Sequence, residues 1–105
     1  MDVEVGQTDV YARWFAKLRD RQARLRIVAR IRRLGLGHAG DVRSVGKGVS
    51  ELRIDYGPGY RVYFTQRGQT LVVLLVGGDK DSQQRDIATA QELAARIPAR
   101  IEVAE

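Results

Sequence analysis

The residues with the clearest chemical potential are three basic side chains and a tyrosine in the second half of this 105-residue sequence: Arg53, Arg61, Tyr63 and Lys80. Arginine and lysine can hold a phosphate group and balance the negative charge that develops on it during a reaction. A tyrosine ring beside them can stack on a base. This combination suits a nucleic-acid ligand. Composition alone favours the alternative interpretation, an ordinary solvated sheet face.

A β-hairpin is predicted to bring these side chains together. Two alternating runs, Ser50–Tyr56 and Tyr60–Thr65, flank the turn sequence Gly57–Gly59, which is typical of two antiparallel strands. Side chains alternate between the two faces of a strand, so Arg53 and Arg61 are expected on the same face of the sheet. The apolar side chains of both strands form the opposite face, which is predicted to pack against helices. The face with the arginines is predicted to be uncovered.

A third strand, Leu71–Val76, is predicted directly after the hairpin. Its six apolar residues in succession are typical of a strand that is buried on both faces. It completes a three-stranded antiparallel meander. We expect Leu71, Val73 and Leu75 to join a single core beneath the helices, and Leu74 to lie under the C-terminal helix or to face an open groove.

Helical patterns surround the meander. A first amphipathic helix is followed by a second at about Arg21–Leu34, with Asp20 as a break or cap between them. Asp2–Val5 is expected to be a short edge strand of the same sheet, and Leu36–Gly48 a glycine-rich loop. Asp81 and Ser82 form an N-cap signal, and a last helix is predicted from there to about Ile97. This order indicates an α+β fold, with the N-terminal strand and two helices packed on one face of a mainly antiparallel sheet.

Length and composition limit the classes of site. At 105 residues the chain is expected to form one domain, residues 1–105. It has no cysteine, so a thiolate metal site is excluded. Its one histidine is His38, which argues against a zinc site or a histidine-based catalytic triad. Neither a metal nor a cofactor is expected. No apolar run approaches the length of a membrane span, and the N-terminus lacks a signal-peptide pattern, so a cytoplasmic location is expected.

The positive charge is concentrated in one segment. The formal net charge is +5, but Tyr11–Arg33 holds nine of the 18 lysines and arginines and one acidic residue. The segment therefore carries +8, and the rest of the chain sums to −3. Such a block favours phosphate backbones or an acidic protein partner, and a basic surface that only confers solubility is the alternative.

Two stretches resemble a known family. GDVRSVGKGVSELRIDYGPGYRVYF (Gly40–Phe64) and LLVGGDKDSQQRDIATAQEL (Leu74–Leu93) are similar to the RelE/ParE superfamily of bacterial toxins, most of all to its HigB-like branch, the addiction module killer proteins. The resemblance covers almost the whole chain. It implies a RelE-like fold and the toxin of a type II toxin–antitoxin module, neutralised by a cognate helix-turn-helix antitoxin. Such a toxin–antitoxin complex is expected to bind operator DNA through the antitoxin.

The resemblance also implies an activity and its residues. Ribonuclease members of the superfamily cut mRNA in the ribosomal A site by attack of a 2′-hydroxyl on the scissile phosphate. By position in the motifs, Arg61 matches the arginine that contacts this phosphate, Arg53 a basic position on the preceding strand, and Lys80 the basic position after the last strand. The general base stays open between Glu51, Asp81 and a neutral Lys80.

Other positions extend or depart from this pattern. Further RNA contacts are expected from Tyr63, Arg43 and Lys47. Some ribonuclease members carry a tyrosine in the C-terminal segment, where this chain has Arg85–Ile87, and Glu51 stands where another member has lysine. Two other functions therefore remain open: a ParE-like toxin that poisons gyrase, and an inert module that only binds its antitoxin.

Overall fold

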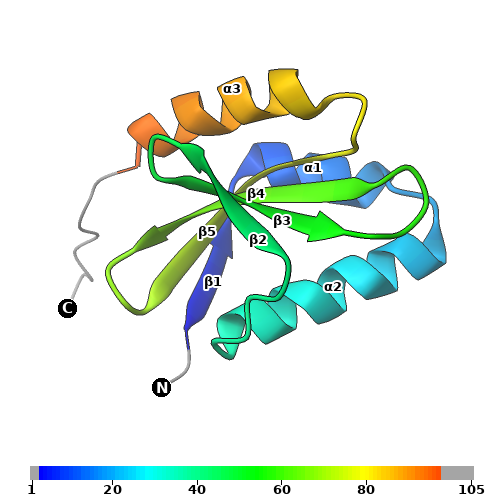
Figure 1. Ribbon diagram of the computed structural model, residues 1–105, viewed down its shortest axis with the longest axis horizontal. Coiled ribbons are helices and arrows are strands. Elements are labelled where there is room, and N and C mark those ends of the chain that lie inside the picture. The colour runs from blue at the N-terminus through cyan, green and yellow to red at the C-terminus, as the bar shows by residue number, and fades with distance from the viewer. Residues whose placement is uncertain (1–2, 98–105) are drawn as a thin grey trace.

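Five strands form one sheet with helices on both of its faces, and the computed structural model describes residues 3–97 of this α+β fold (Figure 1). In chain order the elements are β1 (Glu4–Gln7), α1 (Asp9–Lys17), α2 (Arg21–Gly35), β2 (Val42–Gly46), β3 (Val49–Ile54), β4 (Tyr60–Arg67), β5 (Leu71–Gly78) and α3 (Gln83–Ala95). None of the helices in this described part is long and apolar enough to cross a membrane.

The sheet has the strand order β1-β5-β4-β3-β2. The pairs from β2 to β5 are antiparallel, which confirms the predicted meander, and β1 pairs in parallel with β5. The predicted N-terminal edge strand is also confirmed. It begins later than the predicted Asp2–Val5, of which Asp2 lies outside the described residues.

Strand β2 contradicts the prediction of a loop over Leu36–Gly48. It pairs antiparallel with β3, and a bulge lies between Ser44 and Gly46. The turn that follows has φ angles of 91°, 56° and 76° at Gly46, Lys47 and Gly48, a left-handed backbone that glycine adopts without strain. Gly46 and Gly48, which contributed to the prediction of a loop, therefore belong to the turn of the hairpin between β2 and β3.

Side-chain caps explain where the first two helices begin. The hydroxyl of Thr8 accepts a hydrogen bond of 3.1 Å from the backbone N–H of Tyr11, and the carboxylate of Asp20 accepts one of 3.1 Å from the N–H of Ala23. Both satisfy backbone donors that the first helical turn leaves free. The predicted cap at Asp20 is confirmed.

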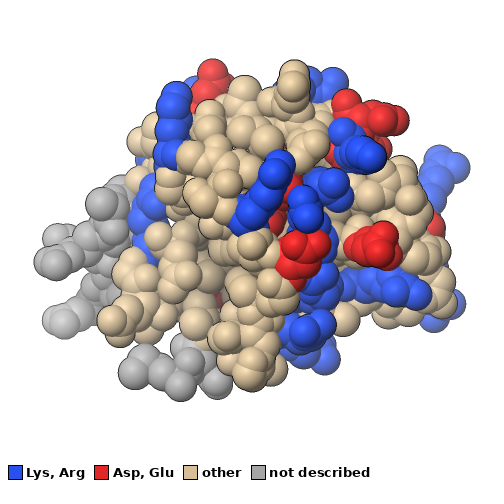
Figure 2. Space-filling view, in the orientation of Figure 1, with Lys and Arg blue, Asp and Glu red and all other residues tan. Residues whose placement is uncertain are grey.

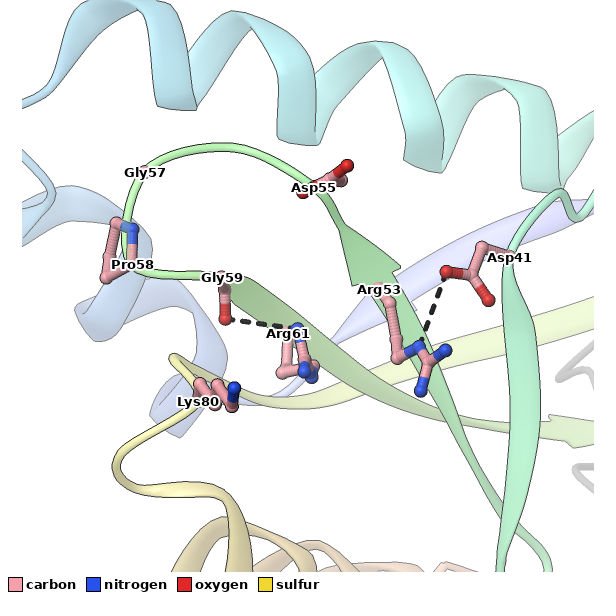
Figure 3. Close-up of a pocket in the computed structure, with 8 residues that line it drawn as sticks. All are labelled: Asp41, Arg53, Asp55, Gly57, Pro58, Gly59, Arg61 and Lys80. Atoms are coloured by element: carbon pink, nitrogen blue, oxygen red, sulfur yellow. Dashed lines mark hydrogen bonds and ion pairs between the residues drawn. The ribbon is translucent and has the colours of Figure 1, made fainter.

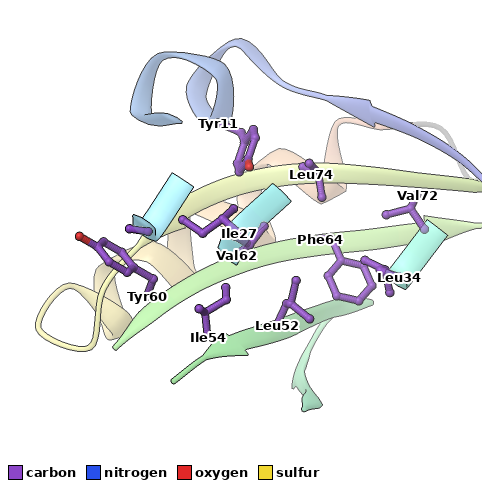
Figure 4. Packing of buried hydrophobic residues seen from close by; sticks show 11 residues of the cluster. Tyr11, Ile27, Leu34, Leu52, Ile54, Tyr60, Val62, Phe64, Val72 and Leu74 are labelled. Atoms are coloured by element: carbon purple, nitrogen blue, oxygen red, sulfur yellow. The ribbon is translucent and has the colours of Figure 1, made fainter. Parts of the chain in front are cut away.

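One face of the sheet packs against α1 and α2 (Figure 4). The main buried side chains here are Tyr11, Ile27, Leu34, Leu52, Ile54, Tyr60, Val62, Phe64, Val72 and Leu74. The residues of β3 and β4 in this core are those that the alternating pattern predicted. This face holds the larger of the two clusters of buried apolar side chains.

Helix α3 covers part of the other face, so the predicted single core and the predicted uncovered face are both wrong. Val49, Tyr63, Val73, Leu75, Val76, Ala90 and Ala94 form this second core. Leu71, Val73, Leu74 and Leu75 thus all lie on the opposite sides to those predicted. A bulge pairs Tyr63 with Val76 and Phe64 with Leu74, which turns Leu75 and Val76 to the same face.

Burial of Tyr11 predicts a loss of stability at high pH. Burial raises the pKa of Tyr11 from 10.0 to about 12, because the charged phenolate is disfavoured in the core. The protonated hydroxyl contributes to the stability of the folded state in full below pH 10.0. This contribution is lost as the pH rises toward 12, because the unfolded chain releases the proton at a lower pH than the folded one. Between about pH 9 and about pH 11, the free energy of unfolding should fall less for Tyr11→Phe than for wild type. Denaturant unfolding at both pH values measures the two changes. Equal losses would contradict this.

Candidate active site

A cavity of about 510 Å³ opens at the end of the sheet where β3 turns into β4 (Figure 3). Its lining residues are Asp41, Arg53, Asp55, Gly57, Pro58, Gly59, Arg61 and Lys80. The three basic residues predicted to act together thus line one cavity. They come from two neighbouring strands and from the segment after β5.

Strand register explains why these residues meet. Arg53 of β3 is paired directly with Arg61 of β4, and Arg61 with Gly78 at the end of β5. Lys80 follows Gly78 by two residues. The row across the three strands is therefore followed by a third basic side chain beyond the sheet, as the strand pattern and the resemblance had suggested.

Two glycines make room for this arrangement. Gly59 has a φ of 80°, and a Cβ atom there would lie 3.4 Å from Nη1 of Arg61 and 3.5 Å from Cβ of Lys80. A Cβ atom on Gly78 would overlap the carboxylate of Asp86 in α3. A side chain at either position would disturb the site, because the first would crowd the basic groups and the second would push α3 away.

Arg61 is held on one side and open on the other. Its Nη1 donates a hydrogen bond of 3.2 Å to the carbonyl of Gly59, and its Nε lies 3.8 Å from a carboxylate oxygen of Glu51. Only 13% of its side chain is exposed. Within the described part of the chain Nη2 has no hydrogen-bond partner, so this nitrogen is available to an oxygen of a ligand.

Glu51 is the buried centre of the network behind Arg61. Its carboxylate accepts hydrogen bonds from Nε of Arg43 at 3.1 Å, the hydroxyl of Tyr63 at 3.1 Å and Nε2 of Gln83 at 2.8 Å. Its exposure is 0%. A carboxylate with three donors and no access to solvent cannot reach a substrate hydroxyl in this conformation, so its position suits holding Arg61 rather than acting as the general base.

Tyr63 cannot stack on a base in this conformation, which corrects the prediction made from its strand face. The ring has 0% exposure because α3 covers it. Burial, and next the charge and hydrogen bond of Glu51, raise the pKa of the Tyr63 hydroxyl. The neutral phenol therefore serves as a hydrogen-bond donor within the Glu51 network.

The other two predicted RNA contacts lie outside the cavity. Arg43 is paired with Glu51 across β2 and β3, and 53% of its side chain is exposed. Lys47 lies in the turn before β3, at the end of the strand remote from Arg53. Six residues of extended chain separate the two, roughly 20 Å at about 3.3 Å per residue. Arg43 could contact a long ligand that leaves the cavity, whereas Lys47 is too far to share its site.

Two acidic residues of the cavity escaped the sequence analysis. A carboxylate oxygen of Asp41 accepts a hydrogen bond of 3.3 Å from Nε of Arg53, and Asp55 also lines the cavity. Asp41 directly precedes β2, so its pairing with Arg53 follows from a strand that the sequence did not reveal. Asp81, a candidate base, is exposed and follows Lys80 but does not line the cavity.

The described residues also bear on metal binding. Among residues 3–97, no three or more histidine or acidic side chains are grouped so that they could hold a metal ion. His38 is exposed in the segment between α2 and β2. The charged residues that line the cavity are arginine, lysine and aspartate.

The position of Glu51 gives a testable prediction. Glu51→Gln removes the negative charge that contacts Arg43 and Arg61 and replaces one acceptor oxygen by an N–H₂ donor, so the free energy of unfolding should fall by about 1–3 kcal/mol. Asp81→Asn, a matched change of an exposed carboxylate, should leave it nearly unchanged. Denaturant titration measures both values. Equal stability of Glu51→Gln and wild type would show that the network contributes little.

Two comparisons with known proteins place this geometry in context. Residues 13–97 match the family model described as "Phage derived protein Gp49-like (DUF891)". An uncharacterized protein of Haemophilus influenzae is 44% identical over 97 residues, which cover 92% of this chain and 98% of that protein. All the residues that line the cavity lie within the range matched by the family model.

Proposed function

This chain belongs to the Gp49-like family of phage-derived proteins, a family of addiction-module toxins, and from this premise we propose that it is the toxin of a type II toxin–antitoxin module. We assign it to the HigB-like branch of the RelE/ParE superfamily, with a RelE-like arrangement of its sheet and helices. Its activity is that of a ribosome-dependent endoribonuclease, which cuts mRNA in the ribosomal A site and thereby stops translation.

The convergence of Arg53, Arg61 and Lys80 on one cavity is the observation that carries this proposal. Three cations at one position are costly unless an anion shares the site. The carboxylate of Asp41 already pairs with Arg53. Glu51 contacts Arg61 at Nε, so Nη2 of Arg61 and the ammonium group of Lys80 are the donors left for a phosphate group. The cavity volume of about 510 Å³ is in the range of sites that bind small ligands.

The proposed reaction is an internal transfer at the scissile phosphate. The 2′-oxygen forms a bond to phosphorus, the bond from phosphorus to the 5′-oxygen breaks, and a cyclic phosphate and a free 5′-hydroxyl result. The proton of the 2′-hydroxyl goes to a base, and the leaving 5′-oxygen takes one up. Arg61 and Lys80 stabilise the charge of the pentacoordinate phosphate. The candidate proton acceptors are the carboxylates of Asp55, which lines the cavity, and of Asp81, which is exposed and follows Lys80.

The proposal includes a location and partners. The toxin acts in the cytoplasm on mRNA bound to the ribosome. A cognate helix-turn-helix antitoxin binds and neutralises it, and the complex of the two proteins binds operator DNA through the antitoxin. The concentrated positive charge of Tyr11–Arg33 supports an acidic partner of this kind.

Expression of the chain in growing bacteria tests the proposal. We expect growth to stop together with protein synthesis, with new mRNA ends inside translated codons, and growth to resume when the antitoxin is co-expressed. Primer extension on a reporter mRNA maps the ends. If growth stops while the mRNA stays intact and gyrase is stalled, the ribonuclease hypothesis is wrong and the chain is a toxin that poisons gyrase. Normal growth would contradict both hypotheses.

A further inference from the structure

The large apolar side chains that are exposed among the described residues lie on α2 and beside its C-terminal end. These are Val5, Leu25, Val28 and Leu36, with exposures of 36%, 56%, 42% and 58%. Leu25 and Val28 lie in α2, and Leu36 is its C-cap. Val5 of β1 lies beside the C-terminal end of α2, near Leu36, since its Cγ2 atom would be 3.4 Å from a Cβ atom on Gly35. The exposed apolar surface is thus concentrated on one helix.

Helical spacing places these side chains in one line. Leu25, Val28, Arg32 and Leu36 are separated by three, four and four residues, so they share one face of the helix. The buried residues Ala23, Ile27 and Leu34 form the opposite face. We define the α2 stripe as Leu25, Val28, Arg32 and Leu36.

The surroundings of the α2 stripe are strongly basic. Helix α2 contains six arginines and no acidic residue (Arg21, Arg24, Arg26, Arg30, Arg32 and Arg33), and basic side chains lie along it at the lower right of Figure 2. Arg30 is committed to the carbonyls of Arg53 and Ala39. Arg21, Arg32 and Arg33 are exposed, and none of the ion pairs found among the described residues involves them.

We propose that the α2 stripe docks an amphipathic helix of a partner protein, with leucine-type side chains on its inner face and Asp or Glu along its flanks. The apolar residues would be covered by the inner face, and the exposed arginines would pair with the acidic flanks. This inference rests on the surface of α2 and does not require the ribonuclease activity. If the proposed function holds, the antitoxin is the protein expected to carry such a helix.

Other occupants fit this surface less well. A second copy of the chain, packed α2 against α2, would bring two sets of six arginines together, and like charges in contact are unfavourable. RNA would pair with the arginines but would leave Leu25, Val28 and Leu36 against a polar backbone. An anionic membrane would bury only the few apolar side chains of the α2 stripe, too little for firm binding.

Binding of a synthetic helix to the full-length protein tests this inference. The probe is a peptide of about 21 residues with leucine at heptad positions a and d and glutamate at e and g. Two control peptides replace either the leucines by serine or the glutamates by lysine. The double variant Leu25→Ser/Val28→Ser keeps the charge of the protein, and Ala88→Ser/Ala95→Ser on the exposed face of α3 is its matched control.

We expect the leucine–glutamate peptide to bind wild type and to gain helical circular dichroism on binding. The Leu25→Ser/Val28→Ser variant should bind about tenfold or more weakly, whereas the α3 control should bind as wild type does. Arg32→Gln should weaken binding more than Arg85→Gln, which removes the same charge from α3.

Several results would overturn the inference. One is that the serine–glutamate peptide binds as tightly as the leucine–glutamate peptide, which would indicate that charge alone drives binding. Another is that the leucine–glutamate peptide does not bind at about 0.1 mM. Tighter binding of a single-stranded oligonucleotide or of anionic vesicles that depends on Leu25 and Val28 would assign the surface to RNA or to a membrane. Dimerisation that the serine variant abolishes would assign it to a second copy of the chain.

Discussion

Arg61→Ala is expected to lower the rate of mRNA cleavage by roughly a hundredfold or more while the protein folds normally. Nη2 of Arg61 faces the cavity without a hydrogen-bond partner in the described residues, and Glu51 and Gly59 hold the guanidinium in place. A contact that strengthens as the phosphate gains charge acts mainly on the rate. Cleavage of a reporter mRNA by the purified variant, at matched protein and ribosome concentrations, measures the loss.

Two further variants separate charge from geometry. Arg61→Lys should restore little activity, because lysine keeps the charge but lacks the two parallel donors of the guanidinium. Lys80→Ala should show a milder loss. Arg13→Ala on the exposed side of α1 removes the same charge and should cut normally. If Arg61→Ala cuts as fast as wild type, the protein is still a ribonuclease but the assigned site is wrong.

Phe64→Ala is expected to lower the free energy of unfolding by about 3–5 kcal/mol. Phe64 is 4% exposed and belongs to the core beneath α1 and α2. Its removal leaves a cavity that the neighbouring side chains fill only in part. Denaturant unfolding monitored by circular dichroism measures the change, and an abrupt single transition would show that the variant still folds.

Leu25→Ala serves as the control for Phe64→Ala. It removes an apolar side chain that is 56% exposed, and its effect should stay within about 0.5 kcal/mol. A Phe64→Ala variant that unfolds at the same denaturant concentration as wild type would contradict the assignment of the core.

The sequence predicted the parts of the fold where polar and apolar residues alternate. In β3 and β4 the alternation assigned Leu52, Val62 and Phe64 to the core face, and Arg53 and Arg61 to the other. That assignment, together with the turn at Gly57–Gly59, was sufficient to bring the basic residues of the site together.

Uniform or ambiguous patterns account for the errors. The apolar run of β5 contains no alternation, so only the pairing of Leu74 with Phe64 decided which side Leu74 faces. Glycines around Lys47 concealed β2, and with it the pairing of Asp41 with Arg53. The burial of Tyr63 depends on where α3 packs, and that is set by contacts far apart in the sequence.

The central claim is that this cavity cleaves mRNA on the ribosome, and a reconstituted reaction tests it most directly. Purified protein is added to ribosomes stalled on a defined mRNA with an empty A site, and the mRNA is analysed on a sequencing gel. The account predicts a cut within the A-site codon that leaves a 2′,3′-cyclic phosphate and a 5′-hydroxyl, and that is lost with Arg61→Ala. Intact mRNA after prolonged incubation with folded protein would contradict it.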